Sequence, residues 1–302
     1  MKKRTTTVIA ILMFLTGLSL LLYPTVSDYM KNLSYRRTIS DYIEAVESMD
    51  DERYEELLEA ARAFNERLAK SGKFMRVLSD EERAEYNSLL NVDGTGVMGY
   101  VSVPKVNISL PVYHGASDEV LQRGAGHLEG TSLPVGGPGT HSVLSAHTGL
   151  PSARMFTDID QLEEGDTFTV QVLNEVLTYQ VDWILVVLPD ETEVLEIEPE
   201  GDYCTLVTCT PYGVNSHRLL VRGYRIPTPV QEEEALNTVE KILGLDDGRM
   251  LSLPAELVIL PAAALLLAAV SAVLLLLWKR VWKQETRLKK KNEKPNQDSP
   301  KP

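Results

Sequence analysis

The chain has 302 residues, of which 44% are hydrophobic and 24% are charged, a composition typical of globular proteins that argues against general disorder. The formal net charge is −13, and Lys and Arg cluster at the two ends, so the middle of the chain is strongly acidic. Proteins that bind nucleic acids neutralise phosphates with clustered Lys and Arg, so the sequence predicts no nucleic-acid partner.

The first segment, residues 1–24, begins with Lys2, Lys3 and Arg4 and continues into an apolar run over residues 8–22. This pattern is typical of a signal peptide or of an uncleaved signal anchor, and both remain open. No clear small-x-small cleavage pattern follows the run, which favours the anchor. In both cases we expect residues from about 25 to 253 to lie outside the cytoplasmic membrane.

Residues 25–96 are predicted to be a helical N-terminal region. Apolar residues recur at three- and four-residue spacing within residues 28–70, which predicts an amphipathic helix that ends at "SGK". "DEERAEYNSLLNVDGTG" predicts a second, short helix that Gly94 and Gly96 stop. We expect this region to pack on the main domain, with a partner-binding helix as the alternative.

From Val97 the pattern changes to short segments rich in Val, Ile, Leu and Tyr, separated by Gly, Pro and Asn. Residues 97–226 are therefore predicted to form a mainly β domain of roughly eight strands, most simply a closed or nearly closed barrel. Within it, "VQVLNEVLTYQV" predicts a hairpin that turns at Asn174 and Glu175.

The C-terminal part divides into three segments. Residues 227–253 are acidic and are interpreted as a stalk, and residues 254–278 are apolar apart from Glu256. The apolar segment exceeds the hydrocarbon thickness of roughly 30 Å and predicts a transmembrane helix, with a buried core helix as the alternative. The basic residues 279–302 then form a cytoplasmic tail by the positive-inside rule, with the main domain outside the cell membrane.

The chain contains two cysteines, Cys204 and Cys209. In a strand they would be separated by roughly 16 Å and point to opposite faces, whereas a disulfide requires α-carbons within about 7 Å. Two cysteines without a C-x-x-C pair also fall short of a structural zinc site. We interpret Cys204 as a buried structural residue, and for Cys209 two roles remain, buried filler or nucleophile.

A candidate catalytic group lies at the ends of the predicted strands. His147 ends "HSVLSAH", Cys209 ends "YCTLVTC", and the chain returns through "TPYGVNS" so that Arg218 comes near Cys209. A thiolate is a strong nucleophile, an arginine can hold a carbonyl oxygen that gains negative charge, and an imidazole can protonate a leaving amine. His114 and His127 lie beside turns, where a structural role is expected. Spacing alone does not show that the three residues converge.

Four stretches resemble the sortases of Gram-positive bacteria, especially the class C pilin polymerases: "TLVTCTPYGVNSHRLLVRG", "HSVLSAHTGLPSARMFTDIDQLEEGDTF", "GYVSVPKVNISLPVYHG" and "GAGHLEGTSLPVGGPGTHS". The resemblance covers about residues 86–226. It implies the eight-stranded sortase β-barrel, with His147, Cys209 and Arg218 as the catalytic residues. The N-terminal helical region and the two predicted membrane segments fit the same class.

The resemblance implies a membrane-anchored cysteine transpeptidase that cleaves an LPXTG-like sorting signal between Thr and Gly. In class C the acyl group passes to a pilin lysine amine and builds a covalent pilus; in wall-anchoring sortases the amine belongs to a peptidoglycan precursor. The implied partners are pilin or surface proteins, and the catalytic domain is expected to be a monomer without metal or cofactor. A hydrolase and a non-catalytic membrane scaffold remain as alternatives from other classes.

One departure concerns the lid. Class C sortases usually carry an Asp-Pro-aromatic lid over the cleft, and the corresponding stretch in this chain, within residues 72–80, is Arg76, Val77 and Leu78. An arginine cannot pair with Arg218, and Phe74 could supply the ring only if the register slipped. We therefore expect a weakly held or differently anchored lid and a Cys209 that reacts readily with a thiol reagent. Protection of Cys209 that is lost on deleting residues 72–80 would argue against this.

Overall fold

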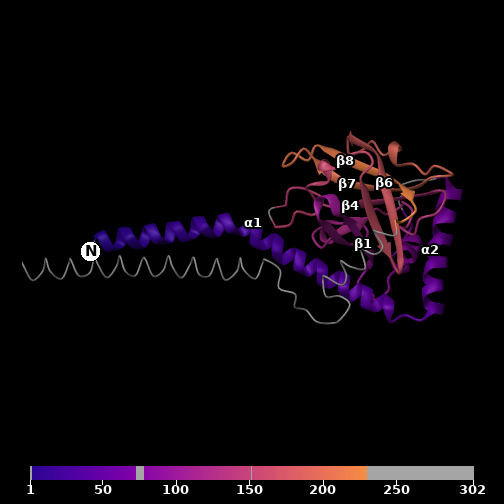
Figure 1. Ribbon diagram of the computed structural model, residues 1–302, viewed down its shortest axis with the longest axis horizontal. Helices are drawn as coiled ribbons and strands as arrows, with labels where there is room; N and C mark the ends of the chain where they lie inside the picture. Colours follow the sequence, from indigo (N-terminus) through magenta and orange to yellow (C-terminus); the bar gives the residue numbers. More distant parts are fainter. Residues whose placement is uncertain (1, 73–77, 151, 230–302) are drawn as a thin grey trace, which may run out of the picture. The chain divides into compact units, whose positions relative to one another are not determined.

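The computed structural model describes residues 2–72, 78–150 and 152–229 (Figure 1). The predicted transmembrane segment at 254–278 and the basic tail lie outside the described residues, as does the stalk from residue 230 onward. Within the described part of the chain, no helix is both long enough and apolar enough to cross a membrane.

The regular elements begin with three helices and continue into a β-rich domain, and the 3-10 turns carry the symbol η. In chain order they are α1 (Lys2–Glu47), α2 (Asp51–Ser71), α3 (Asp80–Ser88), β1 (Val97–Val103), η1 (Pro104–Val106), β2 (Ile108–His114), α4 (Asp118–Leu121), β3 (Ala125–His127), β4 (Thr140–Ser145), η2 (Ile159–Gln161), β5 (Thr167–Val172), β6 (Glu175–Val187), η3 (Glu193–Leu195), β7 (Asp202–Thr210) and β8 (His217–Ile226).

The eight strands form a closed barrel in the order β1-β2-β3-β4-β7-β8-β6-β5, because β5 pairs back onto β1. The predicted barrel is confirmed, and its limits match residues 97–226. Most neighbours are antiparallel, but β2 and β3 are parallel, and so are β4 and β7. Figure 1 shows β7 and β8 side by side between β4 and β6. Because β4 and β7 run in the same direction, their carboxyl ends lie at the same edge of the barrel.

The β5–β6 hairpin is present, but its turn is one residue earlier than predicted. Val172 pairs with Glu175, so the two turn residues are Leu173 and Asn174. Leu173 has φ 53°, an unusual conformation for a leucine. Its side chain is buried, and its backbone N–H donates to the Tyr42 hydroxyl of α1 at 2.8 Å. The contact with α1 therefore determines where the chain turns. This contact is distant in sequence, so the local sequence pattern does not predict it.

The helix predicted over residues 28–70 is two helices. The break lies at residues 48–50, where the Asp50 side chain accepts a hydrogen bond from Arg53 N at 2.8 Å and caps α2. Gly72, with φ 60°, caps the other end of α2 in the left-handed conformation. The short helix α3 is confirmed, and it starts with a capping box between Ser79 and Glu82. Its predicted stop at Gly94 and Gly96 is wrong, because the helix ends at Ser88, where Leu89 adopts an extended conformation.

The helices pack on the barrel, which confirms that part of the prediction. The Tyr42 hydroxyl of α1 donates to Met98 O of β1 at 3.0 Å. In α2, the buried Asn65 amide donates to Leu133 O at 2.9 Å and accepts from Leu133 N at 2.7 Å. The apolar faces of both helices belong to the main core. The helical region is therefore an integral part of the domain.

Two histidines are buried and hydrogen-bonded. His127 lies 2.8 Å from the Tyr86 hydroxyl through Nδ1 and 2.8 Å from Ser132 O through Nε2. The His141 ring lies 2.7 Å from Thr205 Oγ1. Burial is the main cause that lowers the pKa of each histidine from 6.5 to about 4. The structural role predicted for His127 is confirmed.

These two histidines predict how stability depends on pH. Between about pH 6.5 and pH 4 the unfolded chain binds protons that the folded chain does not, so acidification through this range favours unfolding. Each histidine contributes a slope of up to about 1.4 kcal/mol per pH unit. Urea unfolding at several pH values should show a smaller slope for His141→Asn than for the unmodified chain. An equal slope would contradict the prediction.

Candidate active site

Cys209 and Arg218 are direct cross-strand neighbours. Cys209 lies one residue before the end of β7, Arg218 is the second residue of β8, and the antiparallel register pairs them. Opposite residues in such a pair point to the same face, with β-carbons about 5 Å apart. The structure therefore brings the predicted thiol and guanidinium together on one face of the barrel wall.

His147 follows the end of β4, two residues beyond Ser145. The parallel register runs without a shift from Thr140 opposite Asp202 to Ser145 opposite Val207. It continues past the strand end, because Ala146 N donates to Val207 O at 3.1 Å and the Thr208 hydroxyl donates to Ala146 O at 2.8 Å. The next position on β4's path is His147, and the next on β7 is Cys209.

We refer to the three predicted catalytic residues His147, Cys209 and Arg218 as the catalytic row, since they occupy neighbouring positions across three adjacent strand paths. Cys209 lies in the middle, with the histidine on one side and the arginine on the other. Thr208, which no sequence motif singles out, ties the histidine side to β7 through its bond to Ala146. The sequence indicates this role of Thr208 only through its position next to Cys209, which places its side chain on the opposite, inner face of the strand.

Alternation along β7 separates the two cysteines. Cys204, Leu206 and Thr208 are buried toward the barrel interior, whereas Cys209 is partly exposed. Burial, assisted by the charge of Asp202, raises the pKa of the Cys204 thiol well above its usual range. That thiol stays protonated, and the structural interpretation of Cys204 is confirmed.

A small apolar cluster, separate from the main core, lies next to the catalytic row on the outer side of the barrel. Its buried members are Val143, Leu195 and Leu220, with Leu128, Trp183, Val187 and Val207 packed against them. The register places it, because Leu220 pairs with Val207 and Val187 pairs with Arg218. The thiol therefore borders a small apolar cluster of buried and partly buried side chains on the outer face of the barrel wall.

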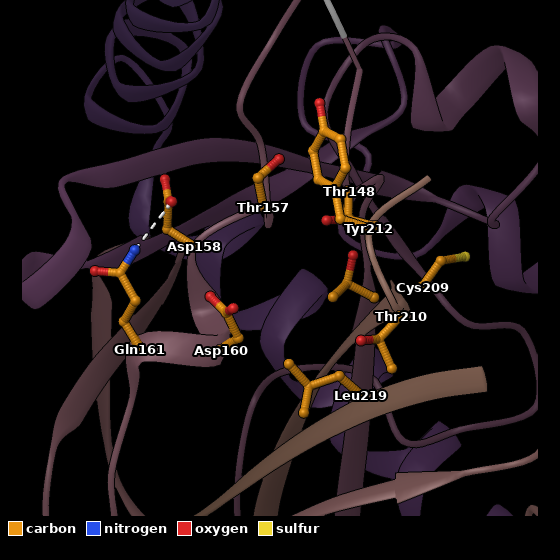
Figure 2. Close-up of a pocket in the computed structure, with 10 residues that line it drawn as sticks. Thr148, Thr157, Asp158, Asp160, Gln161, Cys209, Thr210, Tyr212 and Leu219 are labelled. Carbon is orange, nitrogen blue, oxygen red and sulfur yellow. Dashed lines mark hydrogen bonds between the residues drawn. The ribbon is translucent and has the colours of Figure 1, made fainter. Parts of the chain in front are cut away.

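A cavity of about 180 Å³ touches the other side of β7. It is lined by Thr148, Thr157, Asp158, Asp160, Gln161, Thr208, Cys209, Thr210, Tyr212 and Leu219. In Figure 2 the Cys209 Sγ points away from Asp158 and Asp160. Thr208 and Leu219, which are cross-strand partners, line this cavity from the face opposite to Cys209 and Arg218. The thiol is therefore turned away from the two carboxylates in this view, although Cys209 lines the same cavity.

The Arg218 guanidinium has one nitrogen engaged. Its Nη1 donates to His217 O at 3.0 Å and to Asn215 O at 3.2 Å, both in the segment that leads into β8. Within the described residues its other nitrogens make no hydrogen bond. A guanidinium keeps its charge and carries five donors, so Arg218 can hold this segment and still offer donors to an anionic oxygen.

His147 lines a second cavity, of about 220 Å³, with Lys31, Gln122, Leu150, Ser152, Ala153 and Met155. The His147 carbonyl accepts a hydrogen bond from Phe156 N at 3.1 Å. Across the described ranges no hydrogen bond joins the His147 ring to Cys209. Backbone pairing thus places the three residues side by side, without a direct hydrogen bond between the His147 ring and the Cys209 thiol in the described residues.

The candidate lid falls largely outside the described residues. Phe74, Arg76 and Val77 lie among residues 73–77, which the structure does not describe. Leu78 is described, and its side chain is 4% exposed and belongs to the main core. Leu78 is therefore anchored in the main core, and a weakly held or differently anchored lid stays a prediction.

Comparison with known proteins gives consistent matches. Residues 101–226 match the family model described as "Sortase domain". Among solved structures, sortase C1 from Streptococcus agalactiae is 53% identical, with 64% of this chain and all of that chain covered and a TM-score of 0.62. Streptococcus pneumoniae sortase C is 46% identical, covers 63% of this chain and 97% of that one, and has a TM-score of 0.57. Sortase A of Bacillus anthracis is 27% identical over 232 residues, which are 76% of this chain and 99% of that protein.

Proposed function

Because this chain belongs to the sortase family of cysteine transpeptidases that act on LPXTG-like motifs, we propose that it is a pilin-polymerising enzyme of class C. In this reaction an LPXTG-like signal is cleaved between Thr and Gly, and the acyl group passes to a lysine amine of another pilin subunit. The observation that carries the proposal is the catalytic row, with Cys209 between His147 and Arg218 beside a small apolar cluster.

In the first half-reaction, the Cys209 thiolate attacks the carbonyl carbon of the threonine. The carbonyl oxygen becomes anionic, and free donors of Arg218 stabilise it. His147 then protonates the glycine nitrogen, so that the C–N bond breaks and the glycine leaves as a neutral amine. The products are a thioacyl enzyme, in which a C–S bond has replaced the amide, and the cleaved C-terminal fragment.

In the second half-reaction, a neutral lysine amine attacks the thioester carbon. His147 accepts the proton that the nitrogen loses, the C–S bond breaks, and the Cys209 thiolate is restored. An isopeptide bond joins the two proteins. Splitting one amide exchange into two steps through a thioester is the general advantage of covalent catalysis.

One observation favours the pilin acceptor, and a second concerns where the enzyme lies. The two sortases C described above are 53% and 46% identical to this chain, and the structure of Streptococcus pneumoniae sortase C is described as giving insight into pilin substrate specificity. The apolar segments 8–22 and 254–278 would hold a monomeric enzyme at the cell membrane, with the barrel outside and the basic tail in the cytoplasm. This location would place the catalytic row near membrane-tethered substrates.

The test is mass spectrometry of the full chain in detergent with an LPXTG peptide, with and without a lysine-bearing pilin fragment. We expect a thioacyl adduct on Cys209 that passes to the pilin lysine. Transfer only to peptidoglycan-type amines would instead favour wall anchoring, and release only by water would favour a hydrolase. A chain that forms no adduct would contradict the proposal.

A further inference from the structure

Helix α1 contacts the segment that follows His147, although the two are more than a hundred residues apart in sequence. The Asp28 carboxylate accepts a hydrogen bond from Arg154 N at 2.8 Å, and the Ser27 hydroxyl donates to Ser152 O at 3.2 Å. One turn further along α1, Lys31 Nζ donates to Gln122 O at 3.1 Å. We call residues 148–150 and 152–156 the histidine loop, and two of these contacts reach its backbone.

A backbone hydrogen bond to His147 joins the two ends of the histidine loop. Phe156 N donates to His147 O at 3.1 Å, so the two ends of the loop meet at His147. Gly149 N also donates to Thr157 Oγ1 at 3.1 Å. With its base closed in this way, a displacement of the loop around Arg154 would be transmitted to the His147 backbone.

The same loop reaches the segment after Cys209. A β-carbon on Gly149, which has φ 73°, would lie 3.1 Å from the Tyr212 ring, so the loop backbone is in close approach to that ring. Thr148 lines the cavity that Cys209 and Tyr212 also line. The position of the histidine loop therefore affects both sides of the catalytic row.

Asp28 is the stronger of the two anchors. A carboxylate that accepts from a backbone N–H makes a charge-assisted bond, roughly twice as strong as the neutral bond that Ser27 makes. Its second oxygen accepts from Asn32 Nδ2 at 3.3 Å, one helical turn later, which orients the carboxylate toward the loop. Without Asp28 the Arg154 N–H would lose this partner, and the loop would have to find another arrangement.

We propose that Asp28, assisted by Ser27, is a positioning residue that fixes the histidine loop and thereby the place of His147 beside Cys209. Asp28 acts through Arg154 N and does not contact the reacting atoms. The inference rests on the proposed function, because it assigns His147 the proton transfers of that reaction. It also gives α1 a role in the rate, in addition to its packing on the barrel.

The test compares three variants of the full chain in detergent: Asp28→Ala, Asp28→Asn and, as a matched control on the same helix, Asp41→Ala. Asp41 is exposed, and within the described residues it makes no hydrogen bond or ion pair. We expect Asp28→Ala to lower kcat for thioacyl formation about tenfold, with KM within twofold, because small misplacements of a catalytic group reduce rate more than binding. Asp28→Asn keeps an oxygen that can accept from Arg154 N and should retain most of the rate, and Asp41→Ala should match the unmodified chain.

Hydrogen–deuterium exchange of the histidine loop is the second readout. Asp28→Ala should speed exchange within residues 152–156 about tenfold, while exchange in β7 stays unchanged. An unchanged kcat in Asp28→Ala, or equal losses in Asp28→Ala and Asp28→Asn, would overturn the proposal. If Asp28→Ala does not fold, Ser27→Ala takes its place, with a two- to threefold loss of kcat expected and an unchanged kcat overturning the proposal.

The two proposals fail in different ways. If the unmodified chain forms no thioacyl adduct, the proposed function is wrong, and the exchange measurement alone decides whether Asp28 holds the loop. If the adduct forms normally and Asp28→Ala changes neither rate nor exchange, the function stands and the positioning role is wrong.

Discussion

Replacing Cys209 with alanine is expected to abolish thioacyl formation and transfer, with a loss of at least about 10⁴-fold in kcat. Cys209 lies between His147 and Arg218, and neither neighbour can supply a nucleophile that forms a stable acyl intermediate. Its side chain is only partly buried, so the exchange to alanine should leave folding intact. Intact-mass spectrometry after incubation with an LPXTG peptide is the measurement.

Cys204→Ala is the matched control, because it removes the only other thiol of the chain. Cys204 is completely buried in the main core, so we expect a loss of stability of about 1–2 kcal/mol. Its thiol points away from the catalytic row, so adduct formation should persist at the rate of the unmodified chain. An adduct on Cys204, or a Cys209→Ala variant that still transfers the peptide, would contradict the assignment of the nucleophile.

The barrel and the pairing of Cys209 with Arg218 follow from patterns that the sequence displays. Strand alternation defines which residues face inward, and it is sufficient to predict that Cys204 and Cys209 lie on opposite faces, as they do. The return of the chain through residues 211–216 also predicts that Arg218 lies near Cys209. Hairpin neighbours are local in sequence, which explains why this part could be predicted.

The position of His147 needed more than local pattern. It lies beside Cys209 only because β4 and β7 are adjacent and parallel, and their pairing joins residues 62 positions apart in a constant register. Nothing in the two strand sequences states that they are neighbours. The spacing of the residues therefore does not show that His147, Cys209 and Arg218 meet, and their three roles come from the resemblance to a family.

The sequence predicts that the helical region packs on the main domain, but it does not predict which single hydrogen bonds α1 makes. Leu173 adopts its unusual turn because of Tyr42, and Arg154 N is held by Asp28, a polar residue within a long helical stretch. Nothing in the sequence around Asp28 indicates that its carboxylate binds the backbone of residue 154. Single contacts between residues far apart in sequence determine the local backbone conformation. They do not change the pattern of hydrophobic residues, so sequence patterns do not reveal them.

Arg218→Ala is expected to lower kcat about 10²- to 10³-fold, equivalent to about 2.7–4 kcal/mol of transition-state stabilisation, as for the loss of one oxyanion donor elsewhere. KM for the sorting peptide should change much less, because the carbonyl oxygen gains its negative charge only in the transition state. Steady-state kinetics with a fluorogenic LPXTG peptide measures both quantities. Arg53→Ala serves as the control, since Arg53 pairs with Glu56 of the same helix, α2, at 2.7 Å.

Arg218→Lys separates charge from geometry. The guanidinium holds His217 O and Asn215 O through Nη1 while its remaining nitrogens can face the substrate. A lysine ammonium is a single point of charge and cannot serve both the loop and the oxyanion in this arrangement. We therefore expect it to recover less than a tenth of the lost rate. Recovery to the rate of the unmodified chain would show that charge alone suffices, and a rise in KM without a fall in kcat would move Arg218 from oxyanion stabilisation to substrate binding.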